Sequence, residues 1–197
     1  MQGYDVALAG RVNSDMEEIA RGLRDRDVEL LQTLVEAYQD RLVRYLTYVL
    51  GRRDGVDDLV QETWLRVMER GRSYDGRSRF EPWLFTVARN RAVDFLRRRR
   101  EVSLDAEEGE VGGGVMAVSA EASPFVMAAR TEDAARLAGA LQGLQPMYRE
   151  ALVLRFVEEM SLQEIGAVMG APVATVAARI YRGLAALRRR MEEKHEQ

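Results

Sequence analysis

Carboxylates one helical turn apart stand in the segment Asp57-Asp58-Leu-Val-Gln61-Glu62-Thr-Trp-Leu-Arg66. Asp58 and Glu62 would share a helix face with Arg66. Such carboxylates can gather a divalent metal for a nuclease, but the same face can be a charged docking surface or a solvated face with i,i+4 ion pairs. Because no other acid cluster, histidine or lysine supports a metal-hydrolase centre, a binding surface is the better interpretation.

The composition further limits the metal and catalytic sites that the chain can form. The chain has no cysteine, which excludes disulfides and thiolate metal sites, and its single histidine, His195, stands close to the end of the chain. A histidine-based centre would need a mobile tail to organise it. We therefore expect no metal, no other cofactor and no histidine-based catalytic centre.

A second group of candidates interleaves arginines and aromatic residues over positions 71 to 91. Arginines hold phosphates, aromatic rings stack on unpaired bases, and an asparagine amide pairs with a base edge, a combination that suits single-stranded nucleic acid. The candidates are Arg72, Arg77, Arg79, Phe80, Arg89 and Asn90, and the arginine run that follows adds Arg97 and Arg98. The alternative is that Phe80, Trp83 and Phe85 are core residues at helical spacing, which we favour for Trp83.

The third candidate is a helical hairpin near the end of the chain. Ser161 and Glu164 fit a capping box that begins one helix, Gly170 suits its end, and a second helix is expected to restart near Pro172. This is the pattern of a helix-turn-helix, in which the second helix reads DNA. Its predicted outer face contains Ala174, Thr175, Ala178, Arg179 and Arg182, and its predicted buried face contains Val176, Ile180, Leu184 and Leu187. Taken alone, the hairpin fits two interpretations equally well: a DNA-binding motif, or an ordinary pair of amphipathic helices whose arginines face solvent.

The net charge of -3 hides two basic blocks. Residues 71 to 100 contain nine basic and three acidic side chains, a local charge of +6. Residues 101 to 125 contain six acids and no base, together with three consecutive glycines. Residues 171 to 191 contain five arginines and no acid. The basic blocks are where a phosphate backbone would bind.

Periodicity predicts an all-α protein of two small helical domains on a flexible acidic linker. We expect a polar extension over 1–26, a domain over 27–100, the linker over 101–125, and a second domain over 126–197. Helices are expected over 28–50, over about 56–70, with Val60, Trp64, Val67 and Met68 on the inner face, and from about residue 82 into the arginine run. No apolar run approaches the roughly 20 residues that span a bilayer, so we expect a cytoplasmic protein.

Together these segments resemble the extracytoplasmic-function sigma factors of bacterial RNA polymerase, which keep the two helical domains called region 2 and region 4. The segment 58–66 is similar to the family's polymerase-docking helix, and 83–98 to its promoter-melting helix. The segment 144–156 and the hairpin after it are similar to region 4.

The resemblance implies a role for each group of residues. Asp58, Gln61, Glu62 and Arg66 would face the clamp coiled coil of the largest polymerase subunit, and Asn90 would line the pocket for a flipped minus-10 base. The arginines over 97–100 would hold the DNA backbone nearby, while Thr175, Ala178, Arg179 and Arg182 would enter the minus-35 major groove. Implied partners are core polymerase, through its clamp and flap, promoter DNA and an anti-sigma factor.

One departure from the family pattern concerns the reading helix. Ala177 and Ala178 stand where the family usually has a lysine and a serine, which predicts weaker minus-35 contacts or apolar contacts with thymine methyl groups. Two other functions stay open: a dimeric helix-turn-helix regulator, and a metal-dependent nuclease built on Asp57, Asp58 and Glu62.

Overall fold

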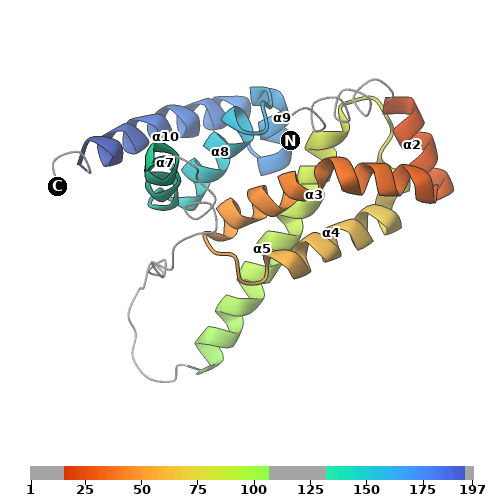
Figure 1. Ribbon diagram of the computed structural model, residues 1–197, viewed down its shortest axis with the longest axis horizontal. Helices are drawn as coiled ribbons and strands as arrows, with labels where there is room; N and C mark the ends of the chain where they lie inside the picture. The colour runs from red at the N-terminus through yellow and green to blue at the C-terminus, as the bar shows by residue number, and fades with distance from the viewer. Residues whose placement is uncertain (1–15, 107–131, 194–197) are drawn as a thin grey trace.

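The computed structural model describes residues 16–106 and 132–193, and this part of the chain is helical, without a β-strand. Figure 1 shows two groups of helices, α2 to α5 in one and α7 to α10 in the other. The elements are α2 (Met16–Asp25), α3 (Val28–Leu50), α4 (Val56–Arg70), the 3-10 turn η1 (Gly71–Ser73), α5 (Phe80–Ala106), α7 (Glu132–Gln142), α8 (Pro146–Phe156), α9 (Leu162–Met169) and α10 (Val173–Glu193). The all-α prediction is confirmed.

Helix α3 is the centre of the first group and forms as its periodicity predicts. The Asp27 side chain caps its N-terminus by accepting hydrogen bonds from the Glu29 and Leu30 amides at 2.9 and 3.2 Å. Gly51 ends it in the left-handed conformation, with φ of 71°. Its buried stripe of Leu34, Tyr38, Leu42, Tyr45 and Leu46 packs against α4 and α5.

The expected polar extension over 1–26 contains a structured helix. Ile19, Ala20 and Leu23 of α2 are buried, and the helix packs against η1 and α3. Gly71 lies so close to Leu23 that a side chain there would meet the α2 backbone. Residues 16 to 25 therefore belong to the first domain.

Helix α5 is longer than the sequence predicted at both ends. It begins at Phe80 rather than near Pro82, and it continues to Ala106, six residues into the stretch expected to be linker. Residues 101–106 contain neither glycine nor proline, so nothing in them ends a helix. The rest of the expected linker lies outside the described residues.

The hairpin of α9 and α10 has the predicted local structure. The Ser161 amide donates to Glu164 Oε2 at 2.7 Å, and the Glu164 amide donates to Ser161 Oγ at 3.3 Å, which completes the capping box. Gly170 ends α9 with φ of 60°. These features confirm the helix-turn-helix, because each is fixed by residues within a few positions of one another.

In each of two predicted inner faces, one residue is exposed instead of buried. Leu184 of α10 is 43% exposed, whereas Gly183 is buried against Leu152 and Tyr148 of α8. Met68 of α4 is also exposed, although it was expected on the inner face. The predictions for Leu184 and Met68 were wrong because adjacent apolar residues make a helix face ambiguous, and a glycine can occupy the contact position when two helices approach closely.

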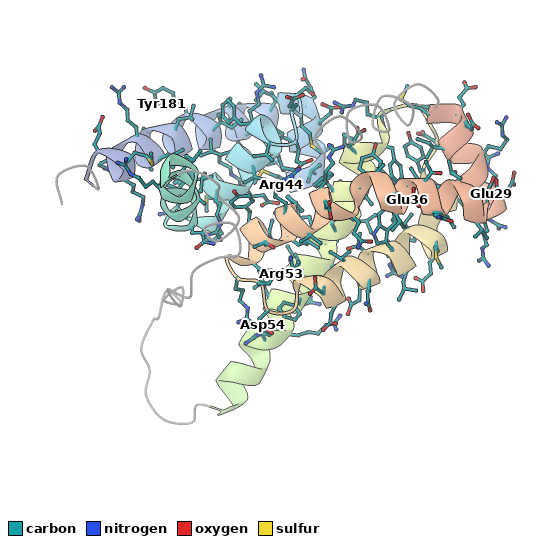
Figure 2. All side chains as sticks on the ribbon, in the orientation of Figure 1. Glu29, Glu36, Arg44, Arg53, Asp54 and Tyr181 are labelled. Atoms are coloured by element: carbon teal, nitrogen blue, oxygen red, sulfur yellow. The ribbon has the colours of Figure 1, made fainter. Side chains whose placement is uncertain are left out.

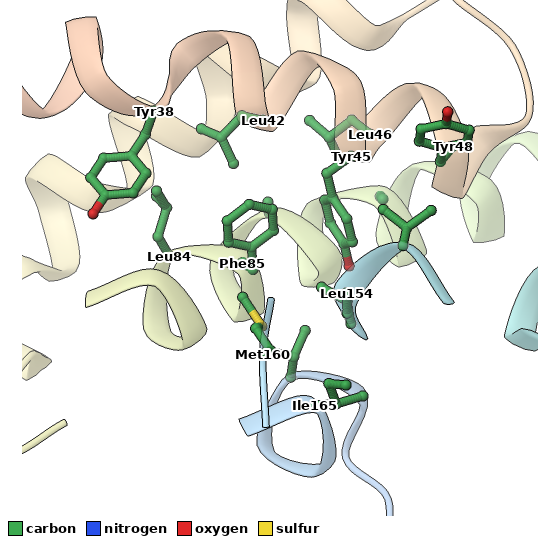
Figure 3. Packing of buried hydrophobic residues seen from close by; sticks show 14 of the residues in the cluster. Tyr38, Leu42, Tyr45, Leu46, Tyr48, Leu84, Phe85, Leu154, Met160 and Ile165 are labelled. Carbon is green, nitrogen blue, oxygen red and sulfur yellow. The ribbon is translucent and has the colours of Figure 1, made fainter. Parts of the chain in front are cut away.

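The two groups of helices share one hydrophobic core. Leu154, Met160 and Ile165 from the C-terminal helices are fully buried with Tyr45 of α3 and Phe85 of α5. Figure 3 shows these side chains meeting between the ribbons of the two groups. Helix α8 packs on α3, and α9 packs on α5. The two domains are therefore in contact in this state of the protein.

Candidate polymerase and promoter DNA interfaces

The outer face of α4 presents the predicted docking residues together. Asp58, Gln61 and Glu62 are exposed, and Leu65 between them is 57% exposed. Arg66 is half-buried, and its Nη1 donates to Glu69 Oε2 at 2.7 Å. The face thus combines carboxylates and an amide with an apolar side chain, which is the make-up of a protein-binding surface. Sequence reasoning missed Leu65 and Met68; both follow Asp58 and Gln61 at helical spacing.

The structure gives the α4 acids no metal-binding geometry. Within 16–106 and 132–193, no three side chains among histidine, cysteine, aspartate and glutamate are grouped so that they could hold a metal ion. Asp57 instead accepts a hydrogen bond from Arg53 Nη2 at 2.6 Å. The carboxylates of α4 are therefore a charged surface in the described part of the chain.

The loop before α5 is ordered by its own side chains. Tyr74 is buried, and its hydroxyl donates to the Ser78 carbonyl at 2.6 Å. Burial, with the nearby charges of Glu81 and Asp75, raises the pKa of Tyr74 to about 12, so the hydroxyl stays a donor. Asp75 Oδ1 accepts from the Arg77 amide at 3.0 Å. This framework leaves the predicted DNA contacts Arg72 and Arg77 exposed on the loop surface.

Phe80 does not have the exposed position that base stacking requires. It is 2% exposed and lies edge-on to Tyr38 and Tyr74, with ring centroids 5.5 and 5.4 Å apart. Trp83, favoured as a core residue, is half-buried with its ring centroid 5.6 Å from that of Phe80. In this structure Phe80 is a core residue, and it has no surface to offer a base.

Asn90 and the arginine run are accessible on α5. Asn90, Arg97, Arg98 and Arg99 are exposed. Arg97 Nη2 is 3.5 Å from Asp94 Oδ1, and Arg99 Nη1 is 3.1 Å from Asp54 Oδ2. Figure 1 shows that the last turns of α5 extend beyond the neighbouring helices.

Two of the predicted DNA-binding arginines are half-buried and paired with carboxylates. Arg89 Nε donates to Glu150 Oε1 of α8 at 2.8 Å. Arg79 Nη2 donates to Glu81 Oε1 at 3.0 Å, and its Nη1 is 3.7 Å from Glu164 Oε1 of α9. Burial lowers the pKa of Arg79, but the hydrogen bond and charge of Glu81 outweigh this and raise it overall, so the pair is ionic.

The first half of α10 presents the predicted reading face. Ala178 and Arg182 are exposed, whereas Thr175 and Arg179 are half-buried. Tyr181 is 77% exposed, and Figure 2 shows it on the outer side of α10. The sequence analysis did not include Tyr181 in the reading face, because it chose small and basic residues for that face. Tyr181 nevertheless follows Ala177 and Ala178 at helical spacing.

Comparison with known proteins assigns both domains. Residues 34–102 match the family model "Sigma-70 region 2", and residues 134–187 match "Sigma-70, region 4". The chain is 30% identical over 175 residues to "ECF RNA polymerase sigma factor SigW" of Bacillus subtilis, covering 85% of this chain and 91% of the relative. The chain belongs to the ECF RNA polymerase sigma factors.

Two solved structures have the same fold as this sigma factor. The sigma factor RpoE in complex with the anti-sigma factor NepR from Bartonella quintana has a TM-score of 0.66 at 21% identity, covering 82% of this chain and 96% of that chain. CnrH in complex with the cytosolic domain of CnrY has a TM-score of 0.63 at 25% identity, covering 89% of this chain and 96% of that chain. The fold of the two helical domains is thus that of known sigma factors.

As a sigma factor, the protein directs RNA polymerase to promoters and starts promoter-specific transcription. The described structure brings its predicted docking residues together on α4 and its predicted minus-35 residues together on α10. The predicted minus-10 residues do not share one environment: Asn90 and four arginines are exposed, Arg79 and Arg89 are half-buried against carboxylates, and Phe80 is buried. In the described ranges, no helix is long and apolar enough to cross a membrane.

Proposed function

We propose that the three exposed faces perform the steps of initiation: α4 binds core polymerase, the loop over 72–79 with α5 reads and melts the minus-10 element, and α10 reads the minus-35 element. The observation that carries this is the capped helix-turn-helix, whose second helix bears five arginines and no acid over residues 171 to 191. Its test is promoter-directed transcription by core polymerase with and without the protein. Core polymerase that neither binds nor responds to the protein would contradict the proposal.

The docking step rests on the mixed face of α4. We propose that Asp58, Gln61, Glu62 and Arg66 contact the clamp coiled coil of the largest subunit, with Leu65 as the apolar centre of that contact. In a protein–protein interface, a buried apolar residue contributes affinity, and the charged residues around it orient the two partners. Region 4 would contact the polymerase flap.

Replacing Leu65 by aspartate is expected to weaken core-polymerase binding at least about tenfold, or about 1.4 kcal/mol. The new charge would be buried in the interface beside Glu62 and Glu69. Because Leu65 is exposed, the folded state should be unaffected. Val28→Asp is the matched control: Val28 is 75% exposed and lies on α3, away from this face. Equal binding by both variants and the unchanged protein would remove Leu65 from the interface.

For minus-10 melting we propose that Asn90 pairs with a flipped base while Arg72 and Arg77 close the loop over it. The arginines Arg97 and Arg98 would hold the backbone beside that pocket. Exposed arginines along an ordered helix suit a strand whose bases are unpaired. Arg79 and Arg89 would join these contacts only after they leave their carboxylates.

For minus-35 reading we propose that Arg182 and Arg179 contact bases or phosphates, with Thr175 and Ala178 lining the groove surface. Tyr181 joins this set because it is the large exposed side chain beside Ala177 and Ala178. With alanine at both of those positions, a long neighbouring side chain is what can reach the groove edge.

Replacing Tyr181 by alanine is therefore expected to reduce affinity for the cognate minus-35 duplex by about 1 to 3 kcal/mol. The measurement is fluorescence anisotropy on a labelled duplex at fixed salt. Tyr181→Phe separates the two parts of the side chain: retained affinity assigns the contact to the ring, and lost affinity assigns it to the hydroxyl. Wild-type affinity in the alanine variant would exclude Tyr181 from the reading face.

We further propose that an anti-sigma protein controls this factor and that it acts in the cytoplasm without catalytic activity of its own. CnrH, the 25%-identical structural neighbour, is bound to the cytosolic domain of another protein, which supports a protein partner of this kind. The nuclease alternative predicts magnesium-dependent strand cleavage by the isolated protein, and the regulator alternative predicts a dimer that binds DNA without polymerase.

A further inference from the structure

Helix α2 lies outside the part of the chain that matches region 2. The match begins at residue 34, whereas α2 covers Met16–Asp25. The helix is nevertheless built into the domain, because its apolar face is buried and it packs against α3 and η1. The turn η1 leads directly into the reading loop, residues 72–79, which we propose to close over the flipped base. Figure 1 shows α2 beside the chain that connects α4 to α5.

The first contact between α2 and this part of the chain is at Gly71, immediately before the reading loop. A β-carbon added at Gly71 would lie 2.9 Å from the β-carbon of Leu23 and 3.1 Å from the Leu23 carbonyl oxygen. Non-bonded carbon atoms attract best at about 3.5 to 4.0 Å, so no side chain fits between the two segments here. The chain therefore enters the loop in direct contact with the backbone of α2.

The second contact is at Gly76, in the middle of the reading loop. Gly76 is buried and has φ of 71°, a left-handed conformation that favours glycine. A β-carbon added there would lie 2.9 Å from the carbonyl oxygen of Met16 and 3.1 Å from the β-carbon of Ala20. Because Gly76 rests on α2, its neighbours Asp75 and Arg77 are the residues of this turn that reach solvent.

A third contact joins the reading loop to α5. Tyr74 is buried, with its ring centroid 5.4 Å from that of Phe80 and 5.6 Å from that of Trp83. Tyr74 thus anchors the loop to α5, while Gly71 and Gly76 anchor it to α2. A loop fixed on two helices loses little conformational entropy when it binds a base, and its fixed shape excludes bases that do not fit.

We propose that α2 determines minus-10 specificity without touching DNA: it holds the reading loop in the shape that accepts the flipped base, and Ala20 is the positioning residue of this contact. The proposal rests on the proposed function, in which the loop closes over that base. Ala20 suits this role because it is 3% exposed and its methyl group lies so close to Gly76 that a larger side chain would displace the loop. If α2 only added stability, base preference would not depend on Ala20.

The test replaces Ala20 by leucine, which also favours a helix but needs space that the reading loop occupies. Gly22→Ala is the matched control. It also adds carbon at a buried position of α2, but the added methyl group would meet Leu30 of α3 instead of the loop. Both variants disturb the packing of α2, and only Ala20→Leu displaces the reading loop.

Limited digestion by trypsin measures the order of the loop without DNA or polymerase. Trypsin cleaves after arginine, and Arg77 is exposed in the loop. A loop that is held in place is cut slowly, because the protease needs a locally opened chain. The rate of cleavage after Arg77, followed by mass spectrometry, should rise about tenfold in Ala20→Leu and stay unchanged in Gly22→Ala. An unchanged rate in Ala20→Leu, or an equal rise in both variants, would overturn the proposal.

Transcription by core polymerase from a barcoded pool of templates, randomised over both promoter elements, measures base preference. The preference at the most selective minus-10 position should fall about tenfold in Ala20→Leu, because a displaced loop no longer excludes the wrong bases. Preferences in the minus-35 element and affinity for core polymerase should be unchanged in both variants. A variant that is merely less stable would instead lose all these functions together, and that result in folded Ala20→Leu would overturn the proposal.

A second pair of variants decides the question if urea unfolding shows that Ala20→Leu is not folded. Gly76→Ala places a methyl group against the Met16 carbonyl of α2, whereas a β-carbon added at Gly170, with φ of 60°, meets nothing within 4 Å. Gly76→Ala and Gly170→Ala therefore share the strain of a left-handed alanine, and only Gly76→Ala presses on α2. A lower minus-10 preference in Gly76→Ala alone would support the proposal. An unchanged preference, or an equal loss in both variants, would overturn it.

The outcomes distinguish this proposal from the proposed function. An unsubstituted protein that directs transcription without any minus-10 preference would contradict the proposed function. An unsubstituted protein with such a preference, together with a folded Ala20→Leu variant that has the same preference, would overturn the role of α2 and leave the proposed function intact.

Discussion

Replacing Phe80 by alanine is expected to destabilise the protein by about 3 to 5 kcal/mol, the usual cost of removing a buried aromatic ring. The ring is nearly inaccessible and packs edge-on against Tyr38 and Tyr74, so the truncation leaves a cavity that these rigid neighbours cannot fill. Urea unfolding followed by circular dichroism measures the loss as a lower midpoint at unchanged slope.

Phe80→Leu distinguishes the core role from the base-stacking role that the sequence suggested. Leucine keeps most of the apolar contact and is expected to cost less than about 1.5 kcal/mol, yet it has no ring to stack on a base. A folded leucine variant that forms open complexes normally would support the core assignment. A folded leucine variant that binds polymerase but no longer melts the promoter would return Phe80 to the DNA interface.

The elements that could be predicted from sequence are those specified locally. The capping box of Ser161 and Glu164, the left-handed Gly170 and the buried stripe of α3 depend on residues a few positions apart. Helical periodicity therefore identified the fold class and the helix-turn-helix. The exposed positions of Asp58, Glu62 and Arg182 followed from the same periodicity.

Side-chain partners from distant segments could not be predicted. Arg89 and Glu150 are 61 positions apart, and Arg41 and Glu158 are 117 apart. The sequence does not indicate that these charged residues pair with one another, because an arginine or a glutamate can equally well face solvent, and an arginine can also bind DNA. The burial of Phe80 has a similar origin: it depends on Tyr38 and Tyr74, which come from another helix and from a loop.

Helical periodicity also does not decide which of two adjacent residues at the edge of a helix face is buried. Met68 and Leu184 are exposed, and each stands next to a buried residue: Val67 in α4, which was predicted to be buried, and Gly183 in α10, which was not. Which member of such a pair is buried depends on the helix packed against it. For Gly183 the decisive neighbour is Leu152 of α8, which fits closely because no side chain separates the helices.

Replacing Asn90 by alanine is expected to slow open-complex formation by about 10- to 100-fold, which corresponds to the 1 to 3 kcal/mol of a lost amide contact with a base. Closed-complex binding, which uses the minus-35 contacts and polymerase, should change little. Permanganate reactivity of unpaired thymines measures the first quantity, and DNA retention at low temperature measures the second.

Stability cannot account for such a loss. Asn90 is exposed on a helix, and alanine has a higher helix propensity than asparagine, so the variant should be as stable as the original or more stable by a few tenths of a kcal/mol. Gln39→Ala is the matched control, because it removes an exposed amide from α3 at a position that no proposed DNA contact uses. An equal effect in both variants, or an equal loss of open and closed complexes in Asn90→Ala, would contradict the flipped-base role. A selective loss at Asn90 would instead place the melting step at this position of α5, next to Arg89, which donates to Glu150.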